Sequence, residues 1–132
     1  MKKTEPFWIL KQVVLAAHTQ LLAAHGGGEG LRDAALLESG LARPQQHYAY
    51  GSPDIIELAA IYTAGIVRNH PFVDGNKRTG FSIGIAFLEL NGFIFEGTEE
   101  DVVQAVFALA AGDLDEAGYA KWLRTNAKRR RR

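Results

Sequence analysis

The chain of 132 residues contains no cysteine and only four prolines. Without cysteine it can form no disulfide, offer no thiolate nucleophile and build no cysteine-ligated zinc site. It also has no apolar run of the roughly 18 residues that a membrane-spanning helix requires. Lys11 and Gln12 interrupt its first apolar stretch and no cleavage site follows, so a signal peptide is not expected. We therefore predict a cytoplasmic protein without a membrane segment.

The chain also lacks a net charge, because 15 Lys and Arg balance 15 Asp and Glu. The balance is uneven, since Lys128 and the four arginines that follow it supply five of the cations, and residues 1–127 hold ten cations against fifteen anions. We predict one domain over residues 1–127 and a basic tail over residues 128–132, which we expect to be a solvated, disordered end. Binding of this tail to nucleic acid is the alternative.

What the chain does contain is 47% hydrophobic and 23% charged residues, the balance of a folded globular domain. Apolar residues recur at helical spacing along most of it, as Ile55, Ala59 and Ile66 do. The pattern predicts six helices, at about residues 10–25, 34–42, 53–69, 77–90, 99–111 and 114–126. We expect an all-α fold around a central buried helix that begins at Lys77, with residues 93–96 extended as half of a small hairpin.

Glycine and proline mark where these helices should start and stop. Residues 26–28 are all glycine and should end the first helix as a flexible hinge; no strand precedes them and no Gly-Lys-Ser/Thr follows, which argues against a phosphate-binding loop. Pro44 should end the second helix and leave residues 44–52 as a polar loop, either a substrate contact or a plain connector. Ser52, followed by Pro53, should cap the third helix.

The densest group of polar residues forms the sequence HPFVDGNKRTG, which begins at residue 70. Pro71 cannot continue a helix and disfavours the helical conformation at His70, so the third helix should end at about Asn69. Gly75 and Asn76 tolerate the backbone angles of a tight reversal. This stretch therefore predicts a short loop that joins two helices.

A helix that begins at Asn76 or Lys77 points its first, unpaired N–H groups into this loop, where the helix dipole favours negative charge. Lys77 and Arg78 add two cations, so a phosphate group is the expected guest. Asp74 has the wrong sign to touch phosphate directly, and we predict that it holds a magnesium ion that bridges to phosphate oxygens. His70 is the member of this group that exchanges a proton near neutral pH, and we predict it to be a general base.

Several neighbours of the loop admit two interpretations. Arg68 either faces the substrate or pairs with an acid of the core. We expect His18 to be a hydrogen-bonded core or surface histidine, and Phe72 to point inward and fix the loop. For His70 the structural alternative is a histidine that ends a helix and bonds a nearby carbonyl group. A transition-metal site of His70 and Asp74 lacks a third ligand at a characteristic spacing.

The loop resembles that of the Fic/Doc family, which has the form His-x-Phe-x-Asp/Glu-Gly-Asn-Gly/Lys-Arg, and Lys77 makes it similar to the Doc branch. Further stretches similar to Doc proteins are GLRD from residue 30, LLES from residue 36, ARP from residue 42, FLELNG from residue 87 and AAG from residue 110. The resemblance covers roughly residues 9–125 and implies an all-α Fic/Doc domain.

Resemblance to the Doc branch implies a toxin that transfers a phosphoryl group from ATP, with Mg²⁺, to a Ser/Thr hydroxyl of translation elongation factor Tu and so stops growth. The expected catalytic residues are His70, Asp74, Asn76, Lys77 and Arg78, and the expected nucleotide-binding residues are Arg68, Asp74, Gly75, Asn76, Lys77 and Arg78. The implied partner is a Phd-like antitoxin that folds on binding. No Ser/Thr-x-x-x-Glu-Gly/Asn inhibitory motif occurs in the chain, so inhibition in trans is expected.

Two positions separate this expectation from transfer of AMP, the activity of the Fic branch. That branch has glycine at the position of Lys77 and arginine at the position of Phe81. Lys77 fills space that a diphosphate would occupy and Phe81 cannot donate a hydrogen bond. These two side chains disfavour AMP transfer, which is the alternative activity. The Doc prototype has alanine where this chain has Gly75, which makes the loop closer to a general Fic loop. A third alternative is a catalytically silent module that binds a phosphate, or nucleic acid through the tail.

Overall fold

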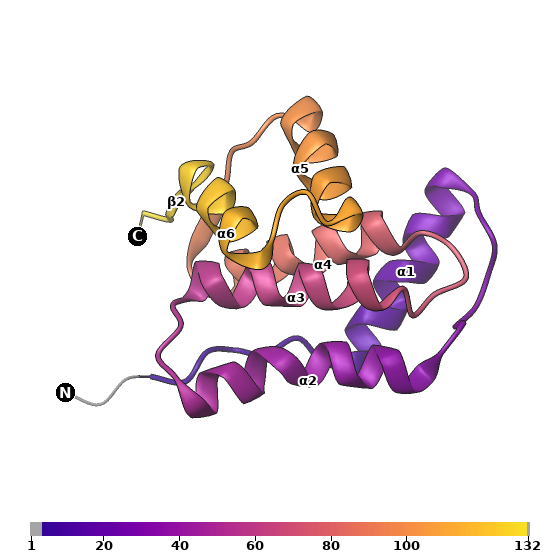
Figure 1. Cartoon of the computed structure of the whole chain (residues 1–132), viewed down its shortest axis with the longest axis horizontal. Coiled ribbons are helices and arrows are strands. Elements are labelled where there is room, and N and C mark those ends of the chain that lie inside the picture. Colours follow the sequence, from indigo (N-terminus) through magenta and orange to yellow (C-terminus); the bar gives the residue numbers. More distant parts are fainter. Residues whose placement is uncertain (1–3, 132) are drawn as a thin grey trace.

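The computed structural model describes residues 4–131, which form helices joined by short connections and one pair of very short strands (Figure 1). In chain order the elements are α1 (Lys11–His25), α2 (Ala34–Tyr50), α3 (Ile55–Asn69), α4 (Asn76–Leu90), β1 (Phe93–Phe95), α5 (Glu99–Ala111), α6 (Glu116–Thr125) and β2 (Ala127–Arg129). The predicted all-α class and its six helices are confirmed for this part of the chain. No helix among these residues is long and apolar enough to cross a membrane.

Helix α3 lies at the centre of the fold, between α2 and α4 and beneath α6 (Figure 1). Every residue from 58 to 67 is buried, which requires that a helix be covered on all sides. α4 buries one face only, at positions such as Thr79, Ile83 and Phe87. We predicted that the central buried helix would be the one that begins at Lys77. The central buried helix is α3 instead, because the other face of α4 carries charged and partly exposed side chains.

Glycines let α3 approach its neighbours closely. A Cβ atom built on Gly65 of α3 would lie 2.9 Å from the carbonyl oxygen of Gly40 in α2, and one built on Gly80 of α4 would lie 3.1 Å from the carbonyl oxygen of Thr63. The Thr63 hydroxyl donates to the carbonyl oxygen of Gly80 at 2.9 Å. Gly80 and Gly84 thus bring the backbones of α4 and α3 together, and the close packing fixes both helices that flank the loop.

Helix α2 continues well past Pro44, so the predicted helix end at Ala42 and the predicted irregular loop at residues 44–52 are wrong. Pro44 has no N–H and leaves the carbonyl oxygen of Gly40 without its helical partner. That oxygen faces the backbone of Gly65 instead, and Pro44 itself is buried. Packing of this face against α3 offsets the lost hydrogen bond, because tertiary contacts supply most of the stability of a helix in a protein.

Two helices begin later than predicted, because an aspartate supplies the cap. Asp54, not Ser52, accepts the N–H of Glu57 at 2.9 Å, while the Glu57 carboxylate accepts the N–H of Asp54 at 2.9 Å. This reciprocal capping box fixes the start of α3. The last helix likewise begins at Glu116 rather than at residue 114, because Asp115 caps it by accepting the N–H of Gly118.

The extended piece predicted at residues 93–96 forms β1, but it is not half of a hairpin. β1 pairs antiparallel with β2 at the C-terminal end of the chain, so α5 and α6 lie between the two strands in the sequence. The partner strand comes from residues predicted to be frayed, which is why the local pattern did not reveal it.

The basic tail is ordered at its start, so the prediction of a disordered end is wrong for the residues of β2. Lys128 forms an ion pair with Glu96 at 3.0 Å, and the Arg129 guanidinium lies 5.2 Å from the centroid of the Phe93 ring. The edge of β1 offers backbone partners that an isolated basic segment would lack. Arg132, the last residue of the predicted tail, lies outside the described residues.

The contact between α2 and α3 predicts a cost for any side chain at residue 65. In Gly65→Ala the new methyl group meets a backbone oxygen that cannot rotate away, and overpacking of about 1–3 kcal/mol exceeds the gain in helix propensity of about 1 kcal/mol. We expect urea denaturation to show a lower free energy of unfolding. Ser39→Ala, at an exposed position beside Gly40, is the control and should change it by less than about 0.5 kcal/mol. A Gly65→Ala variant as stable as wild type would contradict the close contact.

Candidate active site

The loop between α3 and α4, residues 70–75, starts with a strained residue. His70 caps α3 in the left-handed conformation (φ 54°, ψ 53°) and is the one non-glycine residue with positive φ among those described. Its N–H donates to the carbonyl oxygen of Ile66 at 3.1 Å. A side chain in this conformation costs roughly 1–2 kcal/mol, so surrounding contacts must hold it. The end of α3 at Asn69 is as predicted.

Two stacked rings support the loop from the interior. Phe72 is 1% exposed and stacks on His18, with ring centroids 3.7 Å apart and ring planes 10° apart. The Nε2 atom of His18 lies 2.8 Å from the carbonyl oxygen of Asp74, which requires the proton on Nε2. The predictions that Phe72 points inward and that His18 is a hydrogen-bonded core or surface histidine are both confirmed, and the structure buries His18 in the core.

The side chain of Asn76 also stabilises the backbone of the loop. Its side chain is buried, its Oδ1 atom accepts the N–H of Phe72 at 3.0 Å, and its Nδ2 atom donates to the carbonyl oxygen of Phe72 at 3.0 Å. The resemblance to the Doc branch implied a catalytic and nucleotide-binding role for Asn76. In the structure it is committed to the backbone of the turn, so we assign it to holding the loop.

The start of α4 is open to a ligand. Gly75 adopts the left-handed conformation (φ 80°) and provides no side-chain cap. The first N–H that bonds within the helix is that of Thr79, to the carbonyl oxygen of Gly75 at 3.0 Å. The N–H groups of Asn76, Lys77 and Arg78 therefore have no acceptor within the part of the chain that the structure describes. Such a helix start attracts an anion.

A segment distant in the sequence, residues 26–33, lies along the loop, and we call it the strap. The N–H of Val73 donates to the carbonyl oxygen of Gly30 at 3.0 Å. The carbonyl oxygen of Pro71 accepts from two successive strap amides, that of Arg32 at 2.7 Å and that of the next residue at 3.0 Å. Sequence reasoning missed this role, although the glycine cluster and the GLRD stretch marked the segment.

The strap also contacts the carboxylate of Asp74. Its Oδ1 atom accepts the N–H of Gly75 at 2.8 Å, and its Oδ2 atom accepts the N–H of Gly28 at 3.3 Å. These two hydrogen bonds, with a smaller contribution from the Arg78 cation, hold the pKa of Asp74 below its ordinary value. A Cβ atom on Gly27 would lie 2.9 Å from Oδ2, so the approach of the strap requires a residue without a side chain there.

The environment of Asp74 fits one kind of metal ion. Its carboxylate is exposed, and each oxygen keeps lone pairs beyond its one hydrogen bond. Among the described residues, no group of three or more His, Cys, Asp or Glu side chains lies ready to bind a metal. A single carboxylate fits magnesium, which takes its remaining ligands from water and from nucleotide phosphates. It does not fit a tightly held transition metal.

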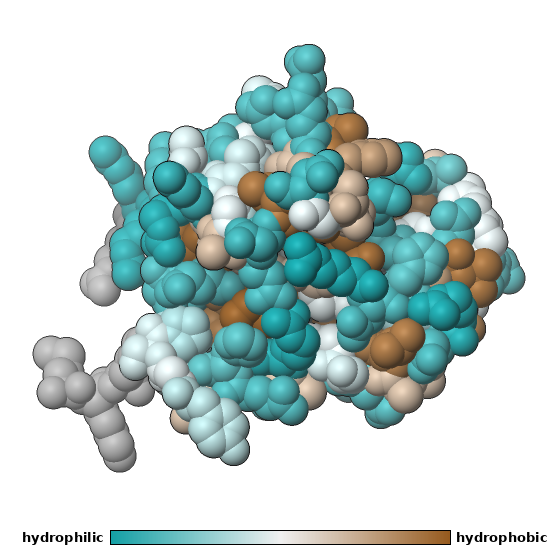
Figure 2. Space-filling model, viewed as in Figure 1, coloured by the Kyte–Doolittle hydropathy of each residue, from teal (hydrophilic) through white to brown (hydrophobic). Residues whose placement is uncertain are grey.

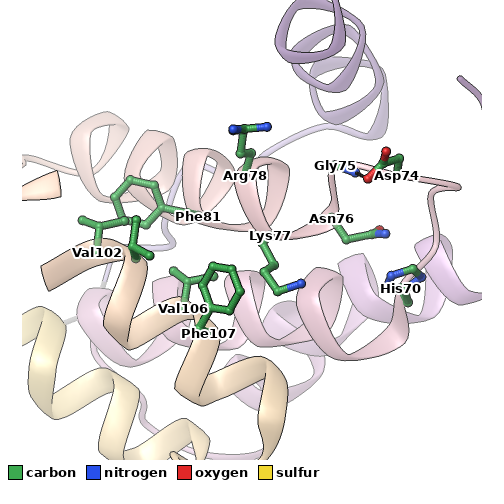
Figure 3. A pocket seen from close by; sticks show the side chains of 11 residues that line it. His70, Asp74, Gly75, Asn76, Lys77, Arg78, Phe81, Val102, Val106 and Phe107 are labelled. Atoms are coloured by element: carbon green, nitrogen blue, oxygen red, sulfur yellow. Dashed lines mark hydrogen bonds between the residues drawn. The ribbon is translucent and has the colours of Figure 1, made fainter. Parts of the chain in front are cut away.

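A pocket of about 340 Å³ opens beside the loop. Its polar end is lined by His70, Asp74, Gly75, Asn76, Lys77 and Arg78, and its apolar end by Phe81, Val102, Val103, Val106 and Phe107. Figure 3 shows that Lys77 and Arg78 leave α4 in different directions, with Lys77 on the side of His70 and Phe107. The Lys77 Nζ atom lies 5.0 Å from the centroid of the Phe107 ring, a cation–π contact.

The apolar end of the pocket reaches the surface on α5. Val103 and Phe107 are more than half exposed, and Figure 2 shows small hydrophobic patches near α5 among hydrophilic side chains. Phe81 packs edge-on against Phe95, with ring centroids 5.5 Å apart. The pocket therefore combines a cationic, amide-rich end with an aromatic and aliphatic wall.

Arg68 lies outside this pocket. Its Nη2 atom donates to the carbonyl oxygen of Leu114 at 3.0 Å. It lines a second pocket of about 610 Å³ that shares His70 and Lys77 with the first. Pairing of Arg68 with an acid of the core is thus wrong for the described residues, and its contact with a substrate stays a prediction.

The arrangement can bind a polyanion and accept a proton beside it. The described hydrogen bonds of His70 are made by its backbone, which leaves the imidazole free. The structural alternative, an imidazole bonded to a nearby carbonyl group, is therefore not found among these residues. A free base next to unpaired amides and the Lys77 cation is suited to removing a proton from a hydroxyl group while the charge of a bound phosphate is stabilised.

Comparison with known proteins gives two matches. Residues 8–88, more than half of the chain, match the Fic/DOC family. The chain is also 42% identical over 72 residues to "Toxin Doc" of Mycolicibacterium smegmatis (strain ATCC 700084 / mc(2)155). That match covers 52% of the chain and 55% of the relative, so the chain spans about half the length of the curated relative it matches. The family match includes the loop and ends before α5, which forms most of the apolar wall.

The lowered pKa of Asp74 predicts a pH dependence of stability. Because the folded pKa is lowered, the ionised carboxylate stabilises the fold fully above the unfolded pKa of roughly 4, and this contribution is lost as the pH falls through the folded pKa. We expect the difference in unfolding free energy between wild type and Asp74→Asn, from urea denaturation, to stay constant between about pH 7 and pH 5 and to shrink below about pH 4. A difference that does not change in acid would show that the bonds from Gly28 and Gly75 do not stabilise the carboxylate.

Proposed function

This chain belongs to the Fic/DOC family, and from that premise we propose that it transfers a phosphoryl group from ATP to a serine or threonine hydroxyl of a protein. One observation carries the proposal. The free imidazole of His70 lies in the same pocket as Lys77 and the open start of α4. A base for the acceptor hydroxyl and a site for phosphate charge are the parts that phosphoryl transfer needs, since its catalysis depends on positioning and electrostatic stabilisation.

ATP suits both ends of the pocket. Its phosphates are placed against the N–H groups of the first turn of α4 and the Lys77 ammonium. Its adenine ring is placed against the apolar wall, where Phe81, Val106 and Phe107 offer a surface for an aromatic base.

In the proposed reaction His70 accepts the proton of the acceptor hydroxyl while the hydroxyl oxygen forms a bond to the γ-phosphorus. The bond from the γ-phosphorus to the bridging oxygen breaks, and ADP leaves with that oxygen. Lys77, Arg78 and the helix amides stabilise charge on the transferring group. Magnesium bound with the nucleotide would neutralise phosphate charge, and Asp74 is the residue that would hold it. His70 then releases its proton to solvent, to which it is exposed.

Transfer of the γ-phosphoryl group is favoured over transfer of AMP by two side chains. Lys77 places a long cation at the start of α4, and the Phe81 ring packs against Phe95 and offers no hydrogen bond to a phosphate. AMP transfer is the second candidate, and it is favoured by Gly75, whose left-handed conformation suits the glycine of a general Fic loop. A catalytically silent phosphate-binding module would not require a free imidazole in the pocket, so the position of His70 argues against it.

The similarity to Toxin Doc supports a biological role as a growth-inhibiting toxin. We propose elongation factor Tu as the acceptor protein, so that phosphorylation inhibits translation. We also propose a cognate antitoxin that folds on binding as the partner that neutralises the toxin. The resemblance of the loop to the Doc branch supports both partners.

Labelled ATP distinguishes the candidate reactions. With lysate as the source of acceptor protein, we expect label to move from the γ-position of ATP and not from the α-position. His70→Ala should reduce the rate by about 10²- to 10⁴-fold, because it removes the base, and should stop growth inhibition on expression. His47→Ala, at an exposed histidine of α2 outside the pocket, is the matched control and should keep full activity. Label that moves from the α-position alone would establish AMP transfer.

Lys77→Met tests the charge at the helix start. Methionine keeps an unbranched side chain against Phe107 but removes the ammonium, and loss of one charge that stabilises the transition state typically costs about 10²- to 10³-fold in kcat. Lys121→Met, at an exposed position of α6, should leave kcat unchanged. An unchanged kcat in Lys77→Met, measured by release of ADP, would remove Lys77 from the mechanism.

A further inference from the structure

We propose that Arg32 of the strap is the positioning residue that holds His70 in its left-handed conformation and so aims the imidazole at the pocket. The inference rests on the proposed function of His70 as a base. It goes further, because it assigns a role in the reaction to a side chain that does not line the pocket.

Arg32 binds three successive carbonyl oxygens at the end of α3. Its Nε atom donates to the carbonyl oxygen of His70 at 2.7 Å, and its Nη2 atom donates to that of Asn69 at 3.0 Å. Its backbone N–H donates to the carbonyl oxygen of Pro71 at 2.7 Å. The carbonyl groups of Asn69 and His70 are ones that the end of a helix leaves without partners, and a cation is favoured there by the helix dipole.

These bonds fix the two dihedral angles of His70. The N–H of His70 is held by the carbonyl oxygen of Ile66, while its own carbonyl oxygen is held by Arg32. The peptide planes on both sides of the residue are therefore anchored, and the direction of its side chain follows from them. Without the bond to Arg32, the strain of the left-handed conformation would favour relaxation of His70 to a negative φ.

Among the described contacts, only the Arg32 side chain binds the carbonyl oxygen of His70. The stacking of Phe72 on His18 and the bonds of Asn76 fix residues 72–76. Arg32 acts at the opposite end of the loop. It is exposed and forms no ion pair with any described residue, so a large contribution to global stability is not expected.

The planar fork of arginine matters for this role. Two donors in a fixed geometry reach two successive carbonyl oxygens, whereas the ammonium of lysine is a single point of charge. Arg32→Lys therefore keeps the positive charge but removes the pair of fixed donors that reach both carbonyl oxygens. Arg124→Ala is the matched control, because Arg124 is an exposed arginine that pairs with Asp54, at the opposite end of α3 from His70.

The experiment has two readouts for wild type, Arg32→Ala, Arg32→Lys and Arg124→Ala. The first is the backbone conformation of His70 in the free protein, from NMR ¹³Cα shifts and the coupling between its amide and α protons. The second is kcat and KM for ATP in the label-transfer assay. In Arg32→Ala we expect His70 to lose its left-handed signature and kcat to fall about 10- to 100-fold, as for a misplaced catalytic group. KM for ATP should stay within about twofold, because the phosphate site is untouched.

Arg32→Lys should lie between wild type and Arg32→Ala in both readouts, and Arg124→Ala should match wild type. A left-handed His70 in Arg32→Ala, or equal losses in kcat and in affinity for ATP, would overturn the proposal. If Arg32→Ala does not fold, Arg32→Lys decides, and wild-type values in that variant would overturn it. If wild type transfers no label, the proposed function fails, yet the NMR readout still decides whether Arg32 holds His70.

Discussion

The site depends on one strained residue, a histidine held in the left-handed conformation at the end of the central helix. α3 must stop at Asn69 because Pro71 cannot continue it, and the chain must turn at His70 so that α4 can start nearby. The strain is tolerated because the backbone groups of His70 are bonded on both sides. The His70 imidazole lies at the end of a helix and is exposed to solvent. It makes no hydrogen bond with any described residue.

The rigidity behind this residue comes from close packing of α3 with its neighbours. Gly40 and Gly65 allow α2 and α3 to touch through their backbones, and Gly80 brings α4 to α3 in the same manner. Helices in such contact cannot shift independently, since protein interiors are close-packed. The loop therefore connects two helix ends whose separation is fixed, and a site built on fixed elements keeps its geometry better than one on a free loop.

The pocket itself is assembled from three distant parts of the chain. The loop and the start of α4 provide the His70 imidazole and the unpaired amides, the strap orders the loop through Gly28, Gly30 and Arg32, and α5 provides most of the apolar wall. The family match covers the first two parts and ends before the third. The polar end of the pocket therefore lies within the family match, whereas most of its apolar end lies beyond it.

The sequence by itself determined the all-α class, the end of α3, the left-handed Gly75 and the inward Phe72, because proline, glycine and apolar spacing act over a few residues. The tertiary structure alone decided that α2 passes through Pro44, that β2 pairs with β1, that the Asn76 amide holds the turn and that the strap binds the loop. Each of these depends on hydrogen-bond partners or buried surface that another part of the fold supplies. Local preference is a small energy, and such contacts between distant segments override it.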